Sequence, residues 1–169
     1  MIRKAVRADL GQLAEVYHNA RQYMKQTGNP TQWGDTNPPI EKLEQDIERE
    51  QLYVCVDGEE IYGAFVLQYG VEPNYVRPDE GAWLNDEPYG TVHRIASRGT
   101  RKGVFDESLN FCKSQIDNVR IDTHPNNKTM QHLCTRSDFE ECGRITILRD
   151  GSPRIIYHWV RGVTGSQKQ

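Results

Sequence analysis

The chain has 169 residues, with 21 basic and 24 acidic side chains and a formal net charge of −3. This length suits one domain of ordinary size. The slightly acidic balance argues against a general nucleic-acid-binding protein, which is usually basic. No stretch approaches the ~18 consecutive apolar residues of a membrane span, and the opening MIRKAVRADL lacks the apolar core of a signal peptide. We therefore expect a cytoplasmic protein with no nucleic-acid or membrane partner.

The four cysteines, at positions 55, 112, 134 and 142, are scattered and include no Cys-x-x-Cys pair. Three of them fall within apolar patterns. Such cysteines are typically buried and reduced, whereas disulfides and zinc sites need paired spacings. The sequence therefore predicts neither a disulfide framework nor a metal site.

The first third of the chain predicts a strand followed by two helices. Residues 2–7 fit a short strand. A helix that runs to about Thr27 is indicated by apolar residues at three- and four-residue spacing, namely Leu10, Leu13, Tyr17, Ala20 and Met24. The linker after it is rich in Pro, Gly and Asn and carries Trp33. A second, strongly charged helix is expected from about Ile40 to Glu50.

The rest of the chain alternates strands with two further helices. Strands are expected at 52–56, 61–69, about 92–96, 119–123, about 141–148 and 154–160, and helices at about 105–116 and 127–138. Residues 70–88 form a long loop, which in a compact domain is usually functional or a lid. The order predicts a mixed α/β or α+β sheet with helices on both faces. We expect a single domain over residues 1–162 and a flexible C-terminal tail over 163–169.

The stretch from 89 to 116 carries the clearest chemistry. A short apolar strand ends in the polar sequence Ser97-Arg98-Gly99-Thr100-Arg101-Lys102-Gly103, and a helix follows in which Phe105, Leu109, Cys112 and Ile116 share one face. Free N–H groups and the positive end of the helix dipole favour an anion at such a place. This pattern predicts a phosphate or diphosphate site, and a purely solvated basic loop is the alternative interpretation.

This order of elements, with a basic loop between the fourth strand and the third helix, resembles the GNAT superfamily of acetyl-CoA-dependent N-acetyltransferases. Residues 127–139 are similar to the family segment N-x-x-A-x-x-L-Y-x-x-x-G-F. The matching residues are Asn127, Leu133 and Phe139, and the replaced ones are Met130, Cys134 and Asp138. Gly143 also fits the family pattern. The resemblance implies a mixed, mostly antiparallel central sheet.

The basic loop can be aligned with the family pattern Q/R-x-x-G-x-G/A in two registers. In the preferred register Thr100, Gly103 and Phe105 occupy the three defined positions. The other register begins at Arg98 and ends at Gly103. In the preferred register, Phe105 places a large side chain where the family keeps a small one.

The resemblance implies transfer of an acetyl group from acetyl-CoA to a primary amine, on a small molecule or on a peptide or protein. It assigns the CoA arm to the backbone of Ile95, Ala96 and Ser97 and to Asn127. It assigns the diphosphate to the amides of Arg101, Lys102, Gly103, Val104 and Phe105. A plain helix N-cap is the alternative for Asn127.

The transfer needs a base, and His93 on the central strand is the first candidate, with His124 at the end of the next strand as the second. Structural roles are the alternative for both. Cys134, at the family's Tyr position, is expected to be a buried inert thiol. Trp33, Tyr69 and Tyr75 are candidates for the acceptor pocket, with simple packing as the alternative.

Two functions from different classes remain open at this point. One is the N-acetyltransferase, and the other is a non-catalytic acyl-CoA-binding or protein-interaction module on the same fold. The final strand, RIIYHWV, is apolar enough to suggest a partner-facing edge or a sheet shared with a second copy, either of which would allow a homodimer.

Overall fold

The computed structural model describes residues 1–165, which cluster into two compact units. The first unit comprises Met1–Leu67 and His93–Phe111, and the second comprises Gln68–Val92 and the chain from Cys112 onward. Strands β3 (Glu60–Tyr69) and β5 (Gly90–Ser97) and helix α3 (Val104–Gln115) run from one unit into the other. The single domain over residues 1–162 stays a prediction.

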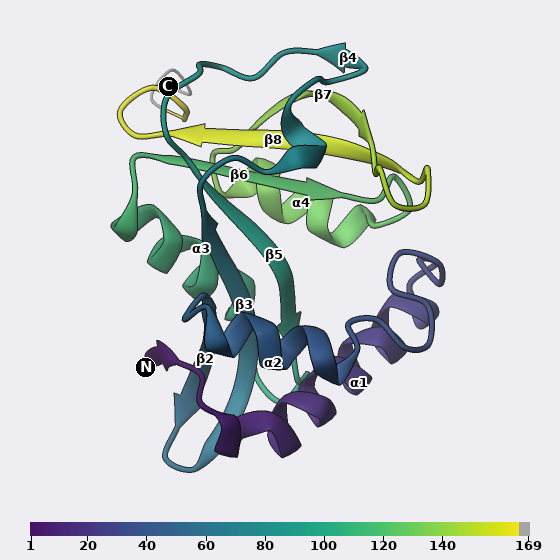
Figure 1. The fold of residues 1–169 in the computed structure, drawn as a ribbon, viewed down its shortest axis with the longest axis vertical. Coiled ribbons are helices and arrows are strands. Elements are labelled where there is room, and N and C mark those ends of the chain that lie inside the picture. The colour runs from purple at the N-terminus through teal and green to yellow at the C-terminus, as the bar shows by residue number, and fades with distance from the viewer. Residues whose placement is uncertain (166–169) are drawn as a thin grey trace. The chain divides into compact units, whose positions relative to one another are not determined.

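Within the described residues, eight strands form one sheet in the order β1-β2-β3-β5-β6-β8-β7-β4 (Figure 1). The remaining strands are β1 (Ile2–Lys4), β2 (Leu52–Asp57), β4 (Glu80–Gly81), β6 (Asn118–Thr123), β7 (Glu140–Thr146) and β8 (Pro153–Val160). Strands β5 and β6 pair in parallel, whereas the pairs β1–β2, β2–β3, β6–β8, β7–β8 and β4–β7 are antiparallel. The predicted mixed α/β fold with a mostly antiparallel sheet is confirmed.

In the first unit, helices cover both faces of the strands. Val54 and Ala64 belong to the core cluster that α1 (Leu10–Gln26) and α2 (Ile40–Glu48) complete. On the other face, the ring of Phe111 in α3 lies 4.9 Å from that of Tyr53 and 5.7 Å from that of Phe65. Because both faces are covered, β2 and β3 are almost continuously apolar.

Gly63 allows α3 to approach β3 closely. A Cβ built on Gly63 would lie 2.5 Å from Cγ1 of Val104 and 3.3 Å from the carbonyl oxygen of Ala96. Val104 is the first residue of α3 and is only 2% exposed. The missing side chain therefore sets where α3 begins, directly after the basic loop.

In the second unit, residues 70–89 form a strap over one face of the sheet. The strap contains a short 3-10 helix, η2 (Pro73–Tyr75), and β4, which pairs with β7. The ring of Tyr75 lies 4.9 Å from that of Trp83, and its hydroxyl donates to Oδ2 of Asp122 at 2.6 Å. The long loop predicted over residues 70–88 is thus partly regular, and two of its aromatic residues pack against the unit's own core.

A buried cation and a buried imidazole attach the strap to the sheet. The guanidinium of Arg120 lies 4.2 Å from the ring of Trp83 and 3.8 Å from that of Tyr89. His158 accepts a hydrogen bond at Nδ1 from the backbone N–H of Leu84, so its proton sits on Nε2 and is donated to Asn118. Burial, together with the nearby Arg120 charge, lowers the pKa of His158 to about 4.

The C-terminal strand differs from expectation in its position. β8 pairs with β6 on one side and with β7 on the other, so it is not an edge strand. The suggested homodimer through this strand therefore loses its basis. Thr164, inside the predicted tail over 163–169, is buried and bonds to Val160, while residues 166–169 lie outside the described residues. None of the described helices is both long enough and apolar enough to cross a membrane.

Replacing Gly63 with alanine is expected to lower the free energy of unfolding by about 1–3 kcal/mol, because the new methyl group overpacks a buried helix–strand contact. Urea unfolding of the purified variant measures this change. Gly11→Ala is the control, because a Cβ at this helical position meets no atom within 4 Å. The control should be neutral or stabilising by up to ~1 kcal/mol. Equal stability of Gly63→Ala and wild type would contradict the close approach.

Stability should fall as the pH drops from about 6.5 to about 4, because in this window unfolded His158 binds a proton that folded His158 does not. At about pH 4, this proton uptake lowers the free energy of unfolding by about 3 kcal/mol. Urea unfolding between pH 7 and pH 4.5 should show a flatter pH dependence for His158→Gln than for wild type. His132→Gln, at an exposed position of α4 (Lys128–Arg136), should follow wild type. Parallel curves for all three proteins would contradict the buried neutral imidazole.

Candidate functional site

The basic loop, residues 97–103, joins β5 to the N-terminus of α3 within the first unit. Gly99 and Gly103 adopt φ values of +92° and +83°, and a Cβ on either would meet no atom within 4 Å. The backbone N–H of Glu107 donates to the carbonyl of Gly103 at 3.0 Å, so Gly103 caps the helix. The first N–H groups of α3 therefore follow an open turn that only glycine adopts without strain.

Two of the three cations of this loop are already paired. Arg98 forms an ion pair with Glu15 at 3.2 Å, and Arg101 forms one with Asp57 at 2.8 Å. The guanidinium of Arg101 also holds the pKa of the Asp57 carboxyl below its usual value. Lys102 is exposed and forms no ion pair with any residue in the described range 1–165. Among the loop's cations, Lys102 is therefore the one whose charge is available to a ligand.

Carboxylates surround the same end of α3. Thr100 donates its hydroxyl proton to Glu60 in the β2–β3 hairpin at 2.8 Å. Asp106 and Glu107 lie in the first turn of the helix, where Glu107 accepts a hydrogen bond from the hydroxyl of Tyr62 at 2.9 Å. These acidic groups complement the helix dipole and reduce the positive potential that the loop offers to an anion.

The buried face of α3 differs from the predicted one at its first residue. The predicted face begins at Phe105, but Val104 is the buried anchor and Phe105 is only partly buried. Gly63 leaves room for the side chain of Val104 against β3, so the buried face begins one residue earlier than predicted. Leu109 and Cys112 are buried as predicted.

The second half of β5 carries the predicted backbone contacts for the CoA arm. The parallel ladder with β6 involves Gly90–Val92 and ends there. Ile95 and Ala96 are buried, while His93 and Ser97 are partly buried. The hydroxyl of Ser97 accepts a hydrogen bond from the N–H of Gly99 at 3.1 Å and so shapes the start of the basic loop.

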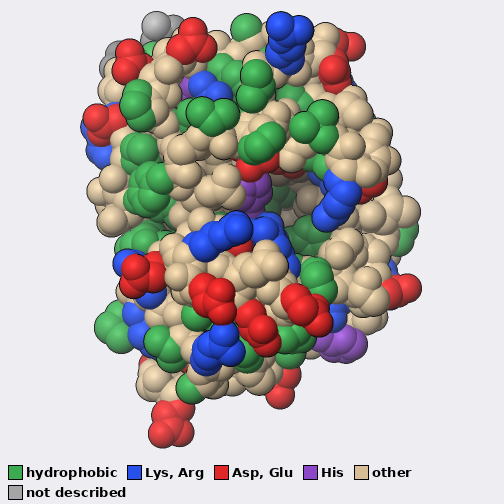
Figure 2. Space-filling view, in the orientation of Figure 1, with side chains coloured by type: hydrophobic (Ala, Val, Ile, Leu, Met, Phe, Trp, Pro, Cys, Tyr) green, Lys and Arg blue, Asp and Glu red, His purple; other side chains and the backbone are tan. Residues whose placement is uncertain are grey.

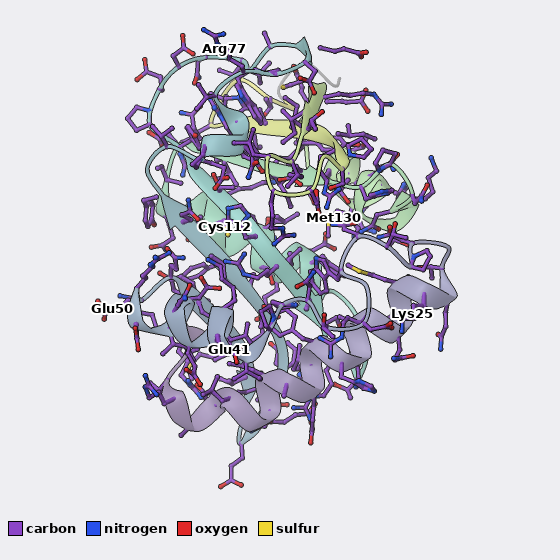
Figure 3. The ribbon with its side chains drawn as sticks, turned by 45° about the vertical axis from the view of Figure 1, so that its right-hand side comes forward. Lys25, Glu41, Glu50, Arg77, Cys112 and Met130 are labelled. Carbon is purple, nitrogen blue, oxygen red and sulfur yellow. The ribbon has the colours of Figure 1, made fainter. Side chains whose placement is uncertain are left out.

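Two further predicted site residues lie in the second unit, Asn127 for binding the CoA arm and His124 as the second candidate base. Asn127 is the N-cap of α4, and its Oδ1 accepts the N–H of Met130 at 3.0 Å (Met130 is labelled in Figure 3). The N-cap interpretation of Asn127 is thus confirmed, while ligand binding by it stays a prediction. His124 accepts the N–H of Asn126 at Nδ1, and burial lowers its pKa. Cys134 is fully buried, which raises its pKa to about 12.

The three candidates for the acceptor pocket have different environments. In the first unit, the ring of Trp33 lies 5.6 Å from that of Tyr17 and packs on the core. In the second unit, Tyr75 is 1% exposed, whereas Tyr69 is 53% exposed. Packing accounts for Trp33 and Tyr75 in this structure, and a pocket role for any of the three stays a prediction.

Solved structures share this arrangement over nearly the whole chain. A GNAT-family acetyltransferase from Streptococcus agalactiae is 27% identical, with a TM-score of 0.84 and 95% of each chain covered. The chain has the GNAT acetyltransferase fold. A ribosomal-protein-alanine N-acetyltransferase from Brucella melitensis is 18% identical (TM-score 0.61; 95% of this chain and 99% of that one covered). The Salmonella typhimurium protein yncA, solved with its cofactor acetyl-CoA, is 12% identical (TM-score 0.64; 98% and 96% covered). No protein-family model and no curated protein matches the chain.

This GNAT fold contains one interaction that the sequence analysis missed. Asp46 of α2 is fully buried and forms an ion pair with Arg94 of β5 at 2.8 Å. The other charged residues of α2 are at least partly exposed, and charged side chains gather over this helix in Figure 2. The sequence could have indicated that Asp46 is buried, because it lies three residues after Leu43 and therefore on the apolar stripe of the helix.

Proposed function

We propose that the protein is an acetyl-CoA-dependent N-acetyltransferase that acts on a primary amine. The observation that carries this proposal is the open glycine turn in front of α3, at the end of β5 in a GNAT fold. Fold alone does not define activity, so the proposal depends on what these residues can bind and do.

The basic loop is suited to a diphosphate. Its two left-handed glycines leave space beside the backbone, and the first turn of α3 supplies N–H groups and the positive end of the helix dipole. Lys102 adds an available charge, whereas the charges of Arg98 and Arg101 are directed to Glu15 and Asp57. We assign the diphosphate of acetyl-CoA to the amides of residues 101–105 and to the side chain of Lys102.

The reaction forms a C–N bond between the amine and the acetyl carbonyl carbon and breaks the C–S bond. The proton that the amine loses must reach the departing thiolate. We assign this transfer to His93, since one imidazole can accept the proton from nitrogen and return it to sulfur. Cys134 is unsuitable as the acid because its thiol is buried with a pKa of about 12. His124 is the second candidate for the base.

The acceptor is proposed only as a class, a primary amine on a small molecule, a peptide or a protein. The alternative function is a non-catalytic acyl-CoA-binding or interaction module. It is favoured by the carboxylates that already pair with Arg98 and Arg101 and so lower the charge available to CoA. Binding of acetyl-CoA without turnover of any amine would support this alternative.

Calorimetric titration of the purified protein with acetyl-CoA tests the proposal, and we expect micromolar affinity, with weaker binding of ATP. Gly103→Val should weaken acetyl-CoA binding about tenfold or more, because a β-branched residue at φ +83° is strained and its side chain would occupy the space that we assign to the diphosphate. Lys102→Ala should weaken binding more than Arg101→Ala does, since Arg101 is already paired.

Gly151→Val is the matched control for Gly103→Val. Gly151, in the β7–β8 hairpin, has φ +74°, and a Cβ added there would meet no atom within 4 Å, so the substitution imposes comparable strain outside the loop. The control should retain wild-type affinity. An unchanged affinity in Gly103→Val would remove the loop from the binding site, and no binding by wild type would remove acetyl-CoA from the proposal.

His93→Ala should lower the rate of acetyl transfer by about 10²–10⁴-fold, the usual contribution of an acid–base group, while changing acetyl-CoA affinity little. The rate is measured as free thiol released with whichever amine a screen identifies. His18→Ala, at an exposed position of α1, is the control and should leave the rate unchanged. Equal losses of rate and of affinity in His93→Ala would make His93 a structural residue.

A further inference from the structure

Arg94 has a backbone conformation that is unusual for a strand. Among the described residues, three that are not glycine have positive φ, namely Glu50, Arg94 and Asp138. Glu50 and Asp138 lie two residues beyond the ends of α2 and α4, where left-handed residues commonly terminate helices. Arg94, with φ +50°, lies inside β5. A strained residue within a strand needs support from its surroundings.

That support comes from both helices that cover this face of the first unit. The side chain of Arg94 reaches α2, where its Nε donates to Oδ2 of Asp46 at 2.9 Å. The backbone carbonyl of Arg94 accepts a hydrogen bond from the hydroxyl of Tyr17 in α1 at 2.7 Å. The other carboxylate oxygen of Asp46 accepts from Gln51 at 3.1 Å and lies 3.9 Å from Nζ of Lys42.

Burying the Asp46–Arg94 ion pair carries a desolvation penalty, so a contribution to stability alone does not account for it. Asp46 is completely buried and Arg94 is 17% exposed, so both charges lose much of their hydration. Well-packed apolar residues often replace a buried ion pair without loss of stability, and buried polar groups in some proteins instead specify one conformation. Here the conformation specified is that of residue 94, between His93 and Ile95.

We propose that Asp46 and Tyr17 are positioning residues that hold Arg94 in its left-handed conformation, and so orient the following backbone of β5 toward the acetyl carbonyl of acetyl-CoA. This rests on the proposed function. The left-handed residue changes the direction of the strand, and bends of this kind redirect neighbouring backbone and side chains next to active sites. The helices α1 and α2 thereby control how the strand receives the acetyl group.

The test compares the affinities for acetyl-CoA and for CoA, which differ only in the acetyl group. Calorimetry on wild type should show tighter binding of acetyl-CoA by about fivefold, the value of one net hydrogen bond. In Asp46→Asn and Tyr17→Phe, the ratio of the affinity for acetyl-CoA to that for CoA should fall toward one. The affinity for CoA itself should stay nearly unchanged. If Asp46 and Tyr17 had only a structural role, their variants would lose affinity for acetyl-CoA and for CoA by the same factor.

A pair of double variants isolates the backbone conformation from the ion pair. Asp46→Asn combined with Arg94→Gly removes both charges but leaves residue 94 free to adopt positive φ. Asp46→Asn combined with Arg94→Ala removes the same charges and penalises positive φ. The glycine variant should keep more of the acetyl-CoA preference than the alanine variant. Equal preferences in the two would overturn the role assigned to the conformation.

The outcomes separate this proposal from the proposed function. If wild type binds neither ligand, the proposed function fails and the positioning role fails with it. If wild type binds both ligands equally, or every variant loses both equally, the positioning role fails while acetyl-CoA binding stands. Thermal melting of each variant reports on folding. Tyr17→Phe keeps the ring that packs on Trp33 and removes one oxygen, so it carries the test even where the Asp46 variants do not fold.

Discussion

The contact between Gly63 and Val104 determines where α3 begins in the first unit. Because Gly63 has no side chain, the first residue of α3 packs directly against β3. The helix therefore begins immediately after the basic loop, and its first N–H groups follow Gly103. A larger residue at position 63 would displace the helix start and, with it, the amides that we assign to the diphosphate. The geometry of the loop thus depends on a packing constraint outside it.

The electrostatics of the loop are weaker than its sequence suggests. In sequence, the loop carries three cations in seven residues. In the fold, the β2–β3 hairpin and α1 bring carboxylates to Arg101 and Arg98, and the first turn of α3 adds two more. Binding of an anion would therefore rely on backbone N–H groups, on glycine geometry and on Lys102. Such a site recognises the shape of a diphosphate more than its charge.

A second constraint joins β5 to the helices that cover it. Arg94 links β5 to α2 through Asp46 and to α1 through Tyr17. A strand residue with positive φ is otherwise unfavourable, and here one contact to its side chain and one to its carbonyl hold it. Because His93 precedes it and Ile95 follows it, these contacts define the local geometry of the candidate reaction site.

Local patterns were sufficient for the main elements, and they also predicted the class of the candidate site. Apolar periodicity predicted the four helices and seven of the strands, and glycines among cations before a helix predicted the anion-binding loop. The N-cap role of Asn127, offered as the alternative to ligand binding, also followed from local chemistry, since Asn is a favoured N-cap before an amphipathic stretch.

Only the tertiary structure decided which groups are available and which are strained. The short strand β4 and the strap's aromatic contacts depend on β7 and on Arg120, and no local pattern contains them. The position of β8 inside the sheet likewise depends on pairing with distant strands. The pairing of Asp46 with Arg94 joins residues 48 positions apart. Periodicity records which residues are buried, whereas the partner of a buried charge is set by how separate elements pack. The sequence by itself therefore determined the fold class and the loop, and tertiary packing decided the loop's free charge and the conformation of β5.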